Sequence, residues 1–219
     1  NVVPQLTANF RVIAIDLPGF GASQAPASAY SFADLAATLN EVLQRLQVEN
    51  AHVVGHSLGG ALSLYFAHTY PQRVNRLVLV DAAGILQQSV YVRHLAQFDT
   101  TGANGLGLAL KSGLNGLGLH FLRKLDRGFD FSAWLAANPR VRNSLLGERT
   151  QIDAAITLAQ EDFTAAIRET RKPITLIWGR DDPIAPLRTG LLLAARLPDA
   201  RLQIIDIVGR NQRILAVRV

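Results

Sequence analysis

The chain alternates short apolar segments, typical of β-strands, with amphipathic segments, typical of α-helices. The apolar segments are residues 10–15 (FRVIAI), 51–54 (AHVV), 77–80 (LVLV), 174–178 (ITLIW) and 202–208 (LQIIDIV). Residues 77–80 are apolar throughout, which is typical of a parallel strand that helices cover on both faces. The alternation predicts an α/β fold with a mostly parallel sheet and helices on both faces.

Three segments between these strands have the features of helices. Residues 31–47 start at Ser31, a good N-cap residue, and Asp34 follows three positions later as the acid of a capping box. Leucines in this segment recur every three or four residues, so one helical face is apolar. Residues 58–70 and 189–197 each end before a proline, which cannot continue a helix.

Residues 84–170 carry no convincing strand signal and are helical in composition. They lie between the third and fourth predicted strands, where an α/β fold can accept an insertion. We therefore expect an inserted helical cap at residues 84–170, with the α/β core formed by residues 1–83 and 171–219.

Residues 55–59 (GHSLG) match the pattern G-x-S-x-G, directly after a predicted strand and at the start of a predicted helix. A serine on this sharp turn is strained, and glycine at positions 55 and 59 avoids a collision across it. The turn lifts the Ser57 hydroxyl above the carboxyl ends of the strands, where the backbone amide of Leu58 can stabilise an oxyanion. Ser57 is the candidate nucleophile, and the alternative is a buried serine in a glycine-rich turn.

A catalytic serine needs a base, and the base needs an acid to orient it. The candidate acids follow the strand predicted at residues 174–178, in the loop at residues 179–183 (GRDDP). Asp182 is our first choice and Asp181 the second. The alternative for both is that the aspartate caps a turn before Pro183 or before the next helix.

Together these motifs resemble those of the α/β-hydrolase superfamily, and within it the serine esterases and lipases that carry a helical cap. The residues that carry the resemblance are 16–23 (DLPGFGAS), 55–60 (GHSLGG) and 178–182 (WGRDD), in the family's order. The resemblance implies that Ser57 is the nucleophile and Asp182 the acid. We also expect His56, inside the elbow, to contact substrate. Serine at position 57, in place of aspartate, argues against the dehalogenase and epoxide-hydrolase branches.

The chain departs from the family pattern at both ends. The family's His-Gly loop, which supplies a second oxyanion donor, would precede residue 1, so the resemblance implies a fold that is incomplete at both termini. The family's catalytic histidine follows a glycine after the last strand, but here Gly209 precedes Arg210. An arginine cannot accept the serine proton at neutral pH.

The five histidines all precede Asp182; they are His52, His56, His68, His94 and His120. Only geometry defines a triad, so His94 or His120 in the insertion would have to fold over Ser57 to serve as the base. The interpretation that we favour for both is a surface or packing residue.

We therefore predict a serine hydrolase that cleaves carboxylic esters of apolar small molecules through an acyl-enzyme at Ser57. We expect its activity to be impaired in this chain, because the catalytic histidine is absent. The leucine- and glycine-rich residues 102–122 favour an apolar substrate. The alternatives are a non-catalytic binding protein with the same fold, or a carbon–carbon hydrolase, thioesterase or lactonase.

Composition excludes several other classes. The chain has no cysteine, which excludes disulfides and thiolate catalysis, and we expect neither a metal nor an organic cofactor. The net charge of +5 comes from scattered residues with no run of five like charges, so we expect no nucleic-acid partner. No apolar stretch reaches the roughly 20 residues that a membrane span needs, so we expect no stable membrane insertion and a cytoplasmic location. The oligomeric state stays open.

Overall fold

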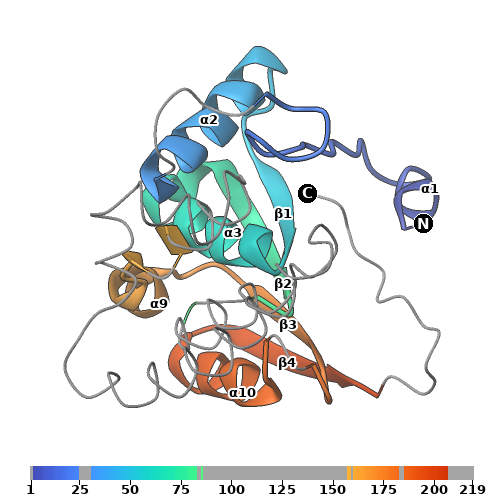
Figure 1. The fold of residues 1–219 in the computed structure, drawn as a ribbon. Helices are drawn as coiled ribbons and strands as arrows, with labels where there is room; N and C mark the ends of the chain where they lie inside the picture. The colour runs from blue at the N-terminus through green and yellow to red at the C-terminus, as the bar shows by residue number, and fades with distance from the viewer. Residues whose placement is uncertain are drawn as a thin grey trace, which may run out of the picture.

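The computed structural model of the 219-residue chain describes residues 2–24, 31–82, 85, 157, 158, 160–182 and 185–206. These residues form a parallel sheet of four strands in the order β1-β2-β3-β4 (Figure 1). The strands are β1 (Ala51–His56), β2 (Val74–Val80), β3 (Ile174–Gly179) and β4 (Ala200–Ile205). The helices are α1 (Val3–Leu6), α2 (Phe32–Arg45), α3 (Leu58–Thr69), the 3₁₀ helix η1 (Pro71–Arg73), α9 (Thr164–Glu169) and α10 (Leu187–Arg196). The predicted parallel α/β architecture is confirmed.

The strand predicted at residues 10–15 is wrong, because this segment has no strand structure. A β-branched run becomes a strand only when a neighbour accepts its backbone hydrogen bonds. β1 lies at the end of the described sheet and is paired there with β2 alone. The segment does lie near β1, since the ring of Phe10 packs edge-on against that of His52 at 6.2 Å.

Helices α3 and α10 pack on the same face of the sheet. A Cβ atom built on Gly55 of β1 would lie 2.2 Å from the carbonyl oxygen of Gly59 in α3. Gly55 is paired with Leu79 in β2, and Leu79 with Leu176 in β3, so these three positions share one face.

Trp178, two positions after Leu176, lies on that face too, and its ring would be 2.7 Å from a Cβ atom on Gly190 of α10. Helices α2 and α9 contact α3. The strands follow each other across the sheet in chain order, and right-handed crossovers then place their connecting helices on one side. Val78 and Ile177 lie on the opposite face of the sheet, and the described residues leave both of them half-buried.

The N-terminus of α2 confirms the predicted cap. The backbone N–H of Asp34 donates to the Ser31 hydroxyl oxygen at 3.0 Å. The Ser31 hydroxyl in turn donates to the Asp34 carboxylate at 2.6 Å, so the acid of the predicted capping box contacts the hydroxyl group.

The core lies between the sheet and this layer of helices. Its largest fully buried side chains are Trp178, Phe32, Phe66, Phe163, Leu62, Leu64, Leu77, Leu79, Leu158, Leu176 and Leu193. The ring of Phe163, just before α9, packs edge-on against that of Phe32 at 5.3 Å. The end of the predicted insertion, from Leu158 onward, thus packs with the core helices, while residues 86–156 lie outside the described part.

Gly190→Ala is expected to lower the free energy of unfolding by about 1–3 kcal/mol, because the added methyl group would overlap the Trp178 ring. The sign is informative, since an unhindered Gly→Ala change inside a helix stabilises by about 1 kcal/mol. Chemical denaturation would measure the difference. Leu191→Ala, at a position 51% exposed in the same helix, is the control and should change stability much less.

Candidate active site

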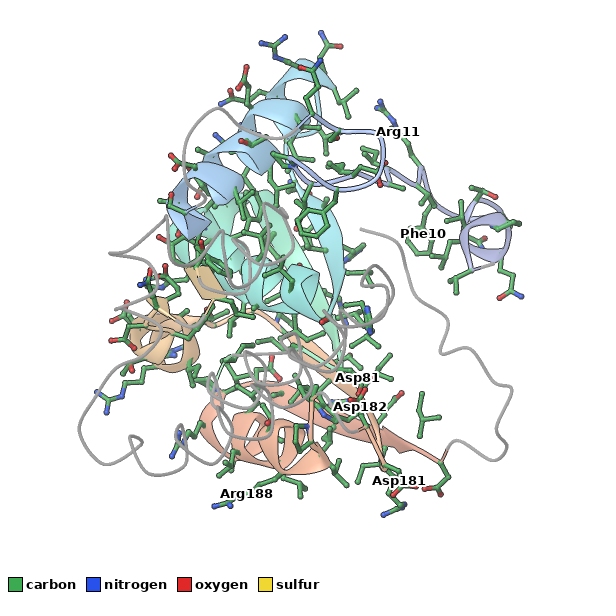
Figure 2. The ribbon with its side chains drawn as sticks, viewed as in Figure 1. Phe10, Arg11, Asp81, Asp181, Asp182 and Arg188 are labelled. Atoms are coloured by element: carbon green, nitrogen blue, oxygen red, sulfur yellow. The ribbon has the colours of Figure 1, made fainter. Side chains whose placement is uncertain are left out.

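The carboxyl ends of the strands meet at one edge of the sheet, since all four strands are parallel. Ser57 directly follows β1, Asp81 directly follows β2, and Asp181 and Asp182 come just after β3. Figure 2 shows Asp81 and Asp182 close together, with Asp181 farther out. Polar side chains from three strands therefore gather at this edge, which is where ligand clefts of α/β sheets occur.

Ser57 occupies a strained backbone conformation, with φ 53° and ψ −119°. A residue other than glycine adopts positive φ at a cost of about 1–3 kcal/mol and keeps it only when its surroundings enforce it. Here the backbone N–H of Ser57 donates to the carbonyl oxygen of Val80 at 3.0 Å, which ties the turn to the end of β2. The Ser57 side chain does not cap α3.

Two glycines allow this turn to pack closely. A Cβ atom on Gly55 would lie 2.2 Å from the Gly59 carbonyl oxygen and 2.4 Å from the Ser63 hydroxyl oxygen, as the elbow pattern leads one to expect. Gly60 is a second such position, because its Cβ atom would lie 2.7 Å from that of Ala82 after β2. The sequence signal for Gly60 is the last glycine of GHSLGG.

The first amides of α3 lie beside Ser57. The backbone N–H groups of Gly60 and Ala61 donate to the Ser57 carbonyl oxygen at 3.0 and 3.2 Å. Leu58 comes before them, as the first residue of α3. Because a helix gives its first amides no acceptor of its own, the Leu58 N–H is available to a developing negative charge, and the helix dipole adds to this.

Asp182 has the geometry of a turn residue. Its carboxylate Oδ1 accepts a hydrogen bond from the backbone N–H of Ala185 at 2.8 Å, and its own N–H donates to the Gly179 carbonyl oxygen at 3.5 Å. The turn-capping role considered as an alternative is therefore present. Asp182 also acts electrostatically on Asp81, whereas exposed Asp181 acts on Arg180, the arginine that contacts Asp206.

Asp81 is a site residue that the sequence reasoning missed. Its side chain is only 4% exposed, its φ is 42°, and its carboxylate Oδ1 accepts a hydrogen bond from the Gly179 N–H at 2.8 Å. Burial raises the pKa of Asp81 above its ordinary value, and the Asp182 charge raises it further, while the Gly179 hydrogen bond and His56 oppose both. A carboxylate directly after the apolar run at residues 77–80 was the available signal.

The described histidines differ in how close they come to this edge. His56 ends β1, is paired with Val80, and acts electrostatically on Asp81. His52 lies about 13 Å back along the same strand. His68 lies near the far end of α3, 3.8 Å from Glu169, and about 16 Å from Ser57 along the helix.

His52 and His68 are therefore both too distant to accept the Ser57 proton. His94, His120 and Arg210 lie outside the described residues.

The described residues hold no group of three or more His, Asp or Glu side chains arranged to bind a metal ion. Among the helices of the same residues, none is long and apolar enough to cross a bilayer.

Asp81→Asn is expected to become more stable relative to the parent protein as pH rises from about 4. The raised pKa of Asp81 means that the folded protein holds this proton more tightly than the unfolded chain. The stability that Asp81 contributes is therefore fully present below its ordinary pKa of 3.8 and is lost as pH rises through the raised value. Thermal unfolding of both proteins between pH 4 and 8 measures the trend.

Asp162→Asn serves as the control for this pH series. Hydrogen bonds from the hydroxyl and the N–H of Thr164 lower the pKa of Asp162. Its contribution is thus fully present above its ordinary pKa of 3.8 and is lost only at lower pH, so the Asp162→Asn and parent curves should run parallel between pH 4 and 8. Parallel curves for Asp81→Asn and the parent would contradict the assignment of a raised pKa to Asp81.

A family model described as "alpha/beta hydrolase fold" matches residues 1–212. The chain belongs to this family. A protein named 2-hydroxy-6-oxononadienedioate/2-hydroxy-6-oxononatrienedioate hydrolase, from Cupriavidus pinatubonensis, is 30% identical to this α/β-hydrolase over 95% of the chain and 73% of the relative. A 2-hydroxy-6-oxo-6-phenylhexa-2,4-dienoate hydrolase from Burkholderia cepacia is 28% identical over 95% of the chain and 73% of the relative.

Solved structures of hydrolases are similar to this chain in both sequence and fold. A meta-cleavage product hydrolase from Pseudomonas fluorescens is 26% identical, with a TM-score of 0.64 over 94% of this chain and 74% of that one. A hydrolase from Pseudomonas aeruginosa is 28% identical, with a TM-score of 0.60 over 92% of this chain and 74% of that one. The predicted superfamily and fold class are thus confirmed, and the relatives are hydrolases.

Proposed function

We propose that this α/β-hydrolase uses Ser57 to attack a carbonyl carbon, with carboxylic esters of apolar small molecules as its first substrate class. The observation that carries the proposal is the backbone of Ser57, which is held at φ 53° on the turn between β1 and α3. A strained serine at the start of a helix, above the carboxyl edge of the sheet, is the geometry of a nucleophile elbow.

In this mechanism the Ser57 Oγ forms a bond to the carbonyl carbon while its proton passes to a base. The oxyanion that develops lies against the Leu58 N–H. Collapse of the tetrahedral intermediate releases the alcohol, which takes the proton from the base and leaves an acyl group on Ser57. Water, deprotonated by the same base, then bonds to the acyl carbon. The bond from this carbon to the Ser57 Oγ breaks, the carboxylic acid leaves, and the base returns its proton to the Ser57 Oγ. Asp182 orients the base, and His56 contacts the substrate.

This chain has no histidine at the position where the family pattern places the general base. The family pattern puts it at position 210, where this chain has arginine, which stays protonated at neutral pH. We therefore propose that hydrolysis by this chain is impaired. The same feature is what favours a non-catalytic binding protein as an alternative.

Cleavage of a carbon–carbon bond next to a ketone is the second candidate, because the relatives named above are hydrolases of 2-hydroxy-6-oxo-dienoates. The two reactions share the attack on a carbonyl carbon but differ in the leaving group. An ester releases an alkoxide, which the base protonates at oxygen. Carbon–carbon cleavage releases a carbanion, which has to be protonated at carbon.

A direct comparison of substrates tests the proposal. Initial rates with p-nitrophenyl butyrate and with 2-hydroxy-6-oxo-6-phenylhexa-2,4-dienoate would be measured by absorbance, for the chain and for Arg210→His. A higher kcat/KM for the ester supports the first candidate, and a higher value for the dienoate supports the second. Turnover of neither substrate by the folded Arg210→His protein would contradict both.

A further inference from the structure

The carboxylate of Asp81 takes the place of its own main-chain carbonyl group in the sheet. In a regular parallel ladder, residue 81 would donate its N–H to the carbonyl oxygen of residue 177 and accept, through its carbonyl oxygen, the N–H of residue 179. The first bond is present, with the Asp81 N–H donating to the Ile177 oxygen at 3.0 Å. The Gly179 N–H instead donates to the Asp81 Oδ1 at 2.8 Å.

The backbone of Asp81 explains the exchange. At φ 42° the chain turns out of the strand, so β2 ends at Val80 while β3 continues to Gly179 beside β4. Gly179 is buried, and an unpaired buried N–H is destabilising. The Asp81 side chain supplies the acceptor that the departing backbone no longer supplies.

This hydrogen bond connects the two loops that hold the nucleophile and the acid. On one side, the Ser57 N–H donates to the carbonyl oxygen of Val80, the residue before Asp81. On the other side, Gly179 is the first residue of the turn at residues 179–182, and its carbonyl oxygen accepts a hydrogen bond from the Asp182 N–H. The end of β2 is therefore bonded to both, and Figure 2 shows Asp81 and Asp182 next to each other.

We propose that Asp81 is a positioning residue of the active site, whose carboxylate fixes the turn at residues 179–182, and with it Asp182, relative to Ser57. The proposal rests on the proposed function, in which Asp182 is the acid. Asp81 touches no reacting atom and acts through the Gly179 amide.

Hydrogen exchange tests the positional part without any need for activity. In Asp81→Ala, the amides of a peptide covering residues 176–182 should exchange at least 10-fold faster than in the parent chain. Asp81→Asn keeps an oxygen acceptor and should retain the protection. Leu191→Ala, at an exposed position of α10, should leave this peptide close to the parent rate. Equal protection of the peptide in Asp81→Ala and the parent would overturn the proposal.

Steady-state kinetics test whether the loss of the Asp81 carboxylate lowers catalysis. The variants would be made in the parent chain if it turns over p-nitrophenyl butyrate, and otherwise in Arg210→His. Asp81→Ala should lower kcat at least 10-fold and change KM less than threefold, while Asp81→Asn and Leu191→Ala keep kcat within threefold. An unchanged kcat in a folded Asp81→Ala protein would overturn the role in positioning. Activity that survives Ser57→Ala would instead contradict the proposed function, so the two failures are distinguishable.

Alanine is itself disfavoured at the positive φ of position 81. Asp81→Gly removes the same acceptor without that penalty, so it replaces Asp81→Ala if the alanine variant does not fold. The expected exchange rates and kcat are the same, and so are the results that would overturn the proposal.

Discussion

Ser57→Ala should lower substrate turnover by at least about 10³-fold, because it removes the only protein atom that bonds to the substrate carbon in the proposed mechanism. Stability should change little, since alanine also has to adopt φ 53° and the Ser57 side chain makes no cap hydrogen bond to α3. Initial rates with p-nitrophenyl butyrate, measured in the Arg210→His background to raise the signal, give the fold-change.

The control for this prediction is Ser31→Ala. Ser31 also precedes a helix, but its hydroxyl caps α2 through hydrogen bonds with the N–H and the carboxylate of Asp34. Its loss should reduce stability by about 1 kcal/mol and leave turnover unchanged. A Ser57→Ala protein that retains more than a tenth of the rate would show that another group attacks the substrate.

Arg210→His should raise turnover by about 10²–10⁴-fold, the range that a well-placed general base supplies. The change converts a side chain that is always protonated into one that accepts a proton near neutral pH, at the position where the family pattern puts its base. The rate should rise with pH as the new histidine loses its proton. A pH–rate profile from 5 to 9 would show this rise.

Arg210→Gln is the matched control, because it removes the same positive charge without adding a base. It should leave turnover within threefold of the parent chain. If Arg210→His folds and gains no more than Arg210→Gln does, the account of the missing base is wrong. The non-catalytic alternative would then be favoured.

The sequence predicted those parts of the fold that depend on local patterns. Residues 77–80 lie in β2 and Ser31 caps α2, because an apolar run and a capping side chain act over a few neighbouring positions. Residues 10–15 have an equally strong strand pattern but no strand structure. Strand formation depends on a hydrogen-bonding neighbour that the local sequence does not specify.

At the candidate active site, too, the sequence predicts features with local causes and not those that depend on a distant partner. The crowding at Gly55 follows from the G-x-S-x-G spacing, since its cause lies four residues away at Gly59. Asp81 could not be found in this way, because its partner Gly179 is 98 residues distant and only the β2–β3 register joins them. Its carboxylate also replaces a main-chain carbonyl group, and no residue pattern encodes that exchange.

In the turn at residues 179–182, the sequence predicts one role for Asp182 and the structure shows another. The sequence predicts Asp182 as the acid, because it follows a strand and occupies a position like that of the family's acid. Its hydrogen bond with the Ala185 N–H shows that it also stabilises its own turn. Substituting Asp182 would therefore alter the loop as well as the charge, which makes it a poor single test of catalysis.

The central claim, that Ser57 is an activated nucleophile, is tested most directly with a fluorophosphonate. In this reaction the serine Oγ forms a bond to phosphorus and fluoride leaves, so the adduct marks the attacking oxygen. The chain and Arg210→His would be labelled while folded, digested and analysed by mass spectrometry. We expect one adduct, on Ser57, formed faster in Arg210→His and absent from Ser57→Ala. No adduct in either folded protein, or an adduct on another serine, would contradict the account.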